Sequence, residues 1–146
     1  MEFLSDMKIS QFLLMLSIAL TTSVMAVERS PSTDNATAYI ISPVNGETVS
    51  NPVTVIFGLK NMGVAPAGIK KPHTGHHHLL INAGQIPKIN QPIPSDDHHQ
   101  HFGKGQTEVS LTLPLGKNTL QLMLGDHFHI PHNPPVISKK ITITVE

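Results

Sequence analysis

Short β-prone segments recur along this chain at regular intervals, each bounded by proline or glycine, and this spacing narrows the possible folds more than any other feature. Beyond residue 26, no window shows a sustained apolar period of helical type. Strands are predicted at residues 37–42, 53–57, 76–82, 107–113, 119–124 and 137–145. Six or seven short strands in about a hundred residues are typical of an immunoglobulin-like antiparallel β-sandwich. We therefore expect an all-β fold of that kind.

The connections between these segments are of two kinds. Asn45-Gly46 and residues 114–117 predict tight turns. Residues 60–75 and 83–106 are much longer than ordinary connectors. Long segments without structure of their own are usually functional or disordered. The sandwich is therefore expected to carry two long loops.

The N-terminus has the pattern of a cleavable export signal. Lys8 precedes a mostly apolar run, residues 9–20, and Val24-Met25-Ala26 fits a signal peptidase site. The run is too short to span a bilayer as a mature helix, although an N-terminal membrane anchor is the alternative. Glu2 and Asp6 are unusual in such a leader, so translation starts at either Met1 or Met7. We predict a signal peptide at residues 1–26 with cleavage after Ala26, a flexible leader at 27–36, and one domain at 37–146 in a periplasmic or secreted protein.

Composition excludes several classes of function. The chain has no cysteine, which removes lipoprotein attachment, disulfides, thiolate metal sites and a cysteine nucleophile. Ten Lys and Arg residues balance ten Asp and Glu, so no electrostatic argument favours nucleic acid or, after cleavage, a membrane surface. The sequence contains neither the H-E-x-x-H nor the G-x-S-x-G motif. These observations do not favour an enzyme.

All ten histidines fall between residues 73 and 132, in three groups. The groups are His73, His76, His77 and His78; His98, His99 and His101; and His127, His129 and His132. If consecutive strands run antiparallel, the three groups meet at one end of the sandwich, a histidine-rich pole. Within the third predicted strand, His76 and His78 face the same side, about 6.6 Å apart.

Imidazoles gathered in this way predict a metal site. Imidazole suits copper, zinc, nickel and iron, and without thiolates a structural zinc site is disfavoured. We therefore expect copper first and zinc second. Met62, Met123, Asp97 and Asp126 are candidates to complete the site or to orient its ligands. The alternatives are histidines that only order loops, or a metal-free cluster that responds to pH.

Several motifs resemble those of one known family. They are Ile41-Ser42-Pro43, Phe57-Gly58-Leu59, residues 63–68, residues 74–81, His101-Phe102-Gly103, Gly125-Asp126 and Pro131-His132. With these motifs the chain resembles the small exported bacterial proteins grouped as domain of unknown function 4399. The resemblance implies a bacterial, periplasmic, single-domain protein and assigns no reaction.

The resemblance also ranks the histidines. Seven lie on motif positions and are the preferred metal ligands: His76, His77, His78, His99, His101, His129 and His132. The other three, His73, His98 and His127, are additional candidates. The sequence thus predicts a periplasmic metal-binding protein acting as a carrier, buffer or chaperone. The alternatives are a metal-free module that binds an envelope protein through the histidine-rich pole, which would be indifferent to chelators, and a small metalloenzyme, which needs an open coordination position.

Overall fold

A computed structural model describes residues 28–146, which form nine strands and no helix. The strands are β1 (Thr37–Ser42), β2 (Thr48–Val49), β3 (Val53–Lys60), β4 (Gly63–Val64), β5 (Thr74–Ile81), β6 (His99–His101), β7 (Glu108–Leu111), β8 (Gly116–Gly125) and β9 (Ile141–Val145). Residues 28–146 include no helix that is long and apolar enough to cross a bilayer. The predicted signal peptide and its cleavage site lie outside the described residues.

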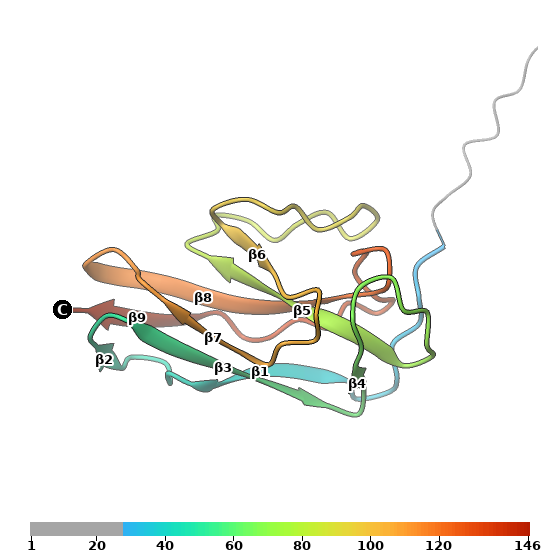
Figure 1. Ribbon diagram of the computed structural model, residues 1–146, viewed down its shortest axis with the longest axis horizontal. Coiled ribbons are helices and arrows are strands. Elements are labelled where there is room, and N and C mark those ends of the chain that lie inside the picture. Colours follow the sequence, from blue (N-terminus) through green and yellow to red (C-terminus); the bar gives the residue numbers. More distant parts are fainter. Residues whose placement is uncertain (1–27) are drawn as a thin grey trace, which may run out of the picture.

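The strands form two sheets packed face to face (Figure 1). One sheet has the order β1-β3-β7, and the other has the order β2-β9-β8-β5-β4, with β6 added beside β5. The pairings are antiparallel except for two short ones, β2 with β9 and β4 with β5. The prediction of an all-β antiparallel sandwich is confirmed, whereas its specifically immunoglobulin-like character stays a prediction.

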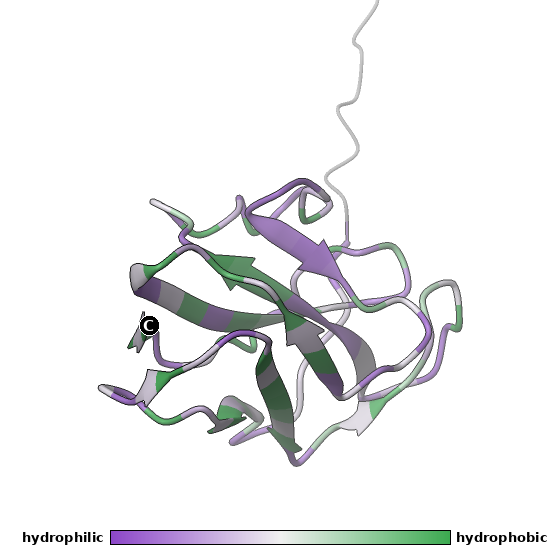
Figure 2. Cartoon of the chain, turned by 60° about the vertical axis from the view of Figure 1, so that its left-hand side comes forward, coloured by the Kyte–Doolittle hydropathy of each residue, from purple (hydrophilic) through white to green (hydrophobic). Residues whose placement is uncertain are grey.

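Apolar side chains alternate along the central strands and fill the space between the sheets. Leu79 of β5, Leu122 of β8 and Val55 of β3 are fully buried there. The neighbouring residues of β5 and β8 point to the opposite side of their sheet, because successive side chains of a strand alternate. We call that side the outer face. Figure 2 shows the contrast in hydropathy between the largely apolar central strands and the hydrophilic β6.

A loop covers part of the outer face. Residues 83–98, here called the outer loop, run over β5 and β8 before the chain enters β6 (Figure 1). Ala83 and Ile93 of this loop pack with Leu80 and Met123 in a second, smaller apolar cluster. Side chains on the outer face are therefore removed from water by loops rather than by a second sheet.

Residues 28–36, expected as part of a flexible leader, make defined hydrogen bonds to the opposite end of the sequence. The amide of Ser32 donates to the carbonyl of Asn133, and the amide of Asn133 donates to the carbonyl of Ser30. The Ser30 hydroxyl reaches the carboxylate of Asp126 at 2.7 Å. This segment therefore lies against the loop that follows β8.

Candidate metal centre

The three consecutive histidines of β5 separate onto the two sides of the sheet. His76 and His78 are directly opposite Gly125 and Met123 of β8 and share the outer face with them. His77 is opposite Leu124 and points into the space between the sheets. This alternation follows from the two-residue period of a strand. It gives the outer face a pair of imidazoles whose ring centroids are 4.7 Å apart.

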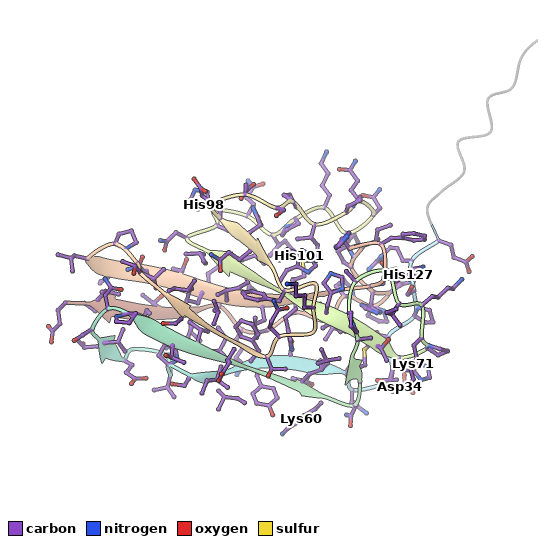
Figure 3. The ribbon with its side chains drawn as sticks, viewed as in Figure 1. Asp34, Lys60, Lys71, His98, His101 and His127 are labelled. Atoms are coloured by element: carbon purple, nitrogen blue, oxygen red, sulfur yellow. The ribbon has the colours of Figure 1, made fainter. Side chains whose placement is uncertain are left out.

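A third and a fourth imidazole come from distant parts of the chain. β6 runs antiparallel to β5 and places His101 directly beside His78. The chain leaving β8 folds back over the outer face and supplies His129, whose carbonyl accepts a hydrogen bond from Ile93 of the outer loop. One or two members of each of the three histidine groups thus meet, on the outer face of the sheet; the topological argument predicted that the groups converge, but expected them at one end of the sandwich. Figure 3 shows His101 close to β5, with His98 and His127 on either side of it.

The four imidazoles are close enough to share one ion. Each of His76, His78, His101 and His129 offers a ring nitrogen, and these four nitrogens all lie within 4.8 Å of one another. Nε2 of His76 is 3.0 Å from Nδ1 of His129. Metal–nitrogen bonds of about 2.0–2.1 Å place tetrahedral ligand atoms about 3.3 Å apart. The separation of 3.0 Å between the nitrogens of His76 and His129 is already close to that spacing.

Two glycines leave room for these rings. A Cβ atom at Gly125 would stand 2.6 Å from Cε1 of His78. A Cβ atom at Gly103 would stand 2.3 Å from Cε1 of His101. Both distances are shorter than van der Waals contact, so any side chain at either position would displace a ring. The size of the site is therefore set by residues that donate no ligand atom.

Burial keeps the inner imidazoles neutral. Loss of hydration, together with repulsion from the neighbouring histidines, lowers the pKa of His76 to about 4 and that of His78 to about 2. Burial and the nearby His129 also lower the pKa of His101. Nδ1 of His76 and Nδ1 of His78 have no hydrogen-bond partner within the described part of the chain. Neutral imidazoles with free ring nitrogens are the form that binds metals.

Asp126 anchors the loop that carries His129. One of its oxygens accepts hydrogen bonds from the amides of Phe128 and Ile130, at 2.9 and 3.0 Å. Burial by itself would raise the pKa of Asp126, but the bonds from the Ser30 hydroxyl and these amides outweigh it and lower the pKa. The loop, residues 126–132, is thus wrapped around an ionised carboxylate. Asp126, a candidate to orient a ligand, touches His129 through the backbone rather than through its ring.

Two of the preferred histidines are buried but lie elsewhere. The ring of His77 packs in the core, 5.2 Å from the ring of Phe57, and neither ring nitrogen has a partner among residues 28–146. Burial lowers its pKa to about 4. His132 is also buried, and its Nε2 donates to the carbonyl of Thr74 at 3.0 Å. The structure does not bring either residue into the group of four.

The remaining histidines make local contacts or are exposed to solvent. Nδ1 of His98 donates to the carbonyl of Ile81, and His99 pairs with Asp96 at 2.7 Å. His99 lies beside Leu80, two residues along β6 from His101, and so stops short of the group. His73 is exposed, and the ring of His127 stacks on Phe128 with a centroid distance of 4.1 Å. None of these four lies in the group.

The non-histidine candidates have different surroundings. Met123 lies directly across from His78 on the outer face and is buried in the smaller apolar cluster. Met62 is partly buried against the main core on the other side of the sheet. Asp97 is exposed on the outer loop. Of these, Met123 alone adjoins a member of the group.

Sequence reasoning did not single out the residues that shape and support the site. Gly103 and Gly125 belong to the motifs His101-Phe102-Gly103 and Gly125-Asp126, and the available signal was that each lies two residues from a histidine, near the end of a strand. Arg29 and Ser30 carried no signal, because their partners are about a hundred positions away. The chemistry that this arrangement can perform is the binding of one ion by four neutral nitrogen donors.

Comparisons with known proteins give one match. A family model described as Domain of unknown function (DUF4399) matches residues 55–146, which include the whole histidine group. This match confirms the resemblance seen in the motifs. No curated protein and no solved structure matches the chain.

Proposed function

We propose that this chain, which belongs to the family described as Domain of unknown function (DUF4399), binds a single metal ion as a periplasmic carrier, buffer or chaperone. The family description gives no function, so the proposal is argued from the site itself. The observation that carries the proposal is the group His76, His78, His101 and His129, whose ligand atoms lie within 4.8 Å of one another. The periplasmic location rests on the predicted signal peptide. Copper is the first choice of metal and zinc the second.

The donor set supports this order. Four imidazoles without a thiolate or carboxylate suit divalent copper, which binds nitrogen ligands more tightly than the other divalent ions of the first transition row. Zinc accepts the same ligands in a tetrahedral arrangement. Because the imidazoles of His76 and His78 are uncharged at physiological pH, they release no proton when an ion binds to their free ring nitrogens.

The exposure of the four rings supports carriage rather than permanent retention. His76 and His78 are buried, His129 is partly exposed, and His101 is exposed. An ion held there has two fixed ligands on the inner side and two accessible ligands on the outer side. A competing protein or small chelator can replace the accessible ligands one at a time, which is the usual requirement for transfer.

The test is metal content and affinity of the protein beginning at residue 27, purified without an affinity tag. Elemental analysis would be combined with titrations of Cu(I), Cu(II) and Zn(II). The same titrations would be run on His101→Ala and His129→Asn, which remove one accessible ligand each. Asparagine is chosen at position 129 because that residue has a φ of 65° and asparagine tolerates this conformation. His73→Asn is the matched control, since His73 has a φ of 57° and lies outside the group.

We expect one tightly bound ion per chain, weakened at least tenfold by either ligand variant and unchanged in the control. The metal that binds most tightly identifies the cargo. Weak binding of several ions per chain, equally strong in all variants, would refute the proposal. A metal-free role in protein binding would then become the leading hypothesis.

A further inference from the structure

A short segment near the start of the described chain lies against the loop that carries His129. We call residues 29–32 the N-terminal strap. The Arg29 guanidinium donates to the carbonyls of Pro131 and His132, and the Ser30 hydroxyl donates to Asp126 at 2.7 Å. Further along the strap, the Ser32 hydroxyl donates to the carbonyl of Pro134. The strap lies outside residues 55–146, the part of the chain that the family model matches.

These bonds fall on the two ends of the loop. Asp126 is its first residue and is 2% exposed, and Pro131 and His132 are its last residues. Between them, the loop holds His129 in a left-handed conformation, with a φ of 65°. This conformation is uncommon for a residue other than glycine and is stabilised by contacts with its surroundings. Asp126 stabilises it from inside by accepting the amides of Phe128 and Ile130.

The strap completes the set of restraints on this loop. The outer loop holds it through the bond from the Ile93 amide to the His129 carbonyl, and residues 60–73 hold it through the bond from the Gly68 amide to the His127 carbonyl. Both bonds act within the loop, whereas the strap bonds act on its ends, where the His132 ring also donates to the carbonyl of Thr74. Without the strap, the second oxygen of Asp126 would lose the hydroxyl that it accepts, and the terminal carbonyls would lose a charged donor.

We propose that the N-terminal strap is a positioning element of the metal centre, which fixes the His129 ring over the outer face and thereby slows release of the ion. This inference rests on the proposed metal-binding function. Arg29 and Ser30 do not touch the ion; they act through the loop and through Asp126. The ligand they position is one of the two accessible ones, so they act on the step by which the ion leaves.

The experiment measures affinity for Cu(II) and Zn(II), and the rate at which each metal is lost to an excess of chelator, in the chain beginning at residue 27. The variants are Arg29→Ala and Ser30→Ala, with the conservative Ser30→Thr, which keeps a hydroxyl. Thr37→Ala is the matched control, because the Thr37 hydroxyl bonds only to the exposed carbonyl of Asn35. We expect Ser30→Ala to speed metal loss about tenfold, the scale of one hydrogen bond to a charged group. Ser30→Thr should restore most of the wild-type rate, and Thr37→Ala should leave it unchanged.

A double-mutant cycle distinguishes positioning from general stability. In a His129→Asn background the ring that the strap positions is gone, so Ser30→Ala should have no further effect on metal loss. If Ser30→Ala has the same effect with and without His129, or none in either background, the strap inference is wrong. If the unmodified protein binds no metal, it is the proposed function that fails, and the two outcomes are therefore separable.

Discussion

At the scale of single residues, the metal site requires a residue without a side chain at position 125. Gly125 lies opposite His76 in the β5–β8 pairing, and the ring of His78 occupies space that a Cβ atom at position 125 would need. The sequence predicted correctly that His76 and His78 share a face, because that follows from strand periodicity alone. It did not reveal the glycine, because the need for space arises only when two strands from distant positions pair in one register.

The replacement Gly125→Ala tests this requirement. The added methyl would stand 2.6 Å from the His78 ring and force that ring out of its position. We expect metal affinity to fall more than tenfold and the free energy of unfolding of the metal-free protein to drop by about 1–3 kcal/mol. Isothermal titration and urea denaturation would measure the two effects.

Gly84→Ala is the control for this change. A Cβ atom at Gly84 meets nothing within 4 Å, and its φ lies outside the left-handed range. That variant should match the wild type in both measurements. Unaltered metal affinity in Gly125→Ala would place the ion away from His78.

At the scale of elements, the site depends on a strand and a loop that the sequence did not predict. The principal strands were found with errors of up to four residues at their ends, the largest at the start of β9, but β2, β4 and β6 were missed. β6 consists of His-Gln-His, which has no β propensity of its own, and it exists because it pairs with the edge of β5. Since β6 runs antiparallel to β5, His101 reaches the group and His99 falls short of it.

The loop of residues 126–132 gives the second prediction. Asp126→Asn keeps the overall shape but removes the negative charge and replaces one acceptor oxygen with an amide donor facing the Ser30 hydroxyl. Hydrogen bonds to a charged group are stronger than neutral ones, so the loop should loosen and metal affinity should fall about tenfold. Equilibrium competition with a chelator would measure this change.

The comparison variant is Asp97→Asn. Asp97 is an exposed carboxylate on the outer loop, and residues 126–132 make their hydrogen bond to that loop through Ile93 rather than through Asp97, so its replacement removes the same charge without removing an anchor of the His129 loop. It should leave metal affinity unchanged. Equal losses in the two variants would mean that net charge, not loop anchoring, is responsible.

At the scale of the whole molecule, buried histidines make stability depend on pH. The folded state lowers the pKa of His76 and His77 from 6.5 to about 4, and that of His78 to about 2. Between pH 6.5 and 4 the unfolded chain therefore binds protons that the folded chain does not. Stability is at its maximum above pH 6.5 and falls as the pH decreases.

Below pH 6.5, the free energy of unfolding should fall by about 1.4 kcal/mol per pH unit for each of these histidines. Urea denaturation of the metal-free protein at several pH values between 7.5 and 5 would measure this dependence. His77→Met should make the dependence shallower, because it replaces a buried imidazole that has no hydrogen-bond partner among the described residues. The same variant should still bind one ion, since His77 faces the core. Stability that does not change over this pH range would show that the rings become protonated without unfolding.

The run His76-His77-His78 also helps to fix the register in which β5 pairs with its neighbouring strands. In the observed register, one imidazole enters the apolar space between the sheets and two face outward. A slip of one residue would send two imidazoles inward and exchange Leu79 with Leu80, leaving a single histidine of the run on the outer face. Each polar ring that is buried in the core without a hydrogen-bond partner costs free energy. The slipped pairing would bury His76 and His78 in this way, so the two histidines that belong to the metal site also disfavour the wrong register. Three adjacent copies of one amino acid, which look ambiguous as a sequence, thus specify a single alignment of the strand.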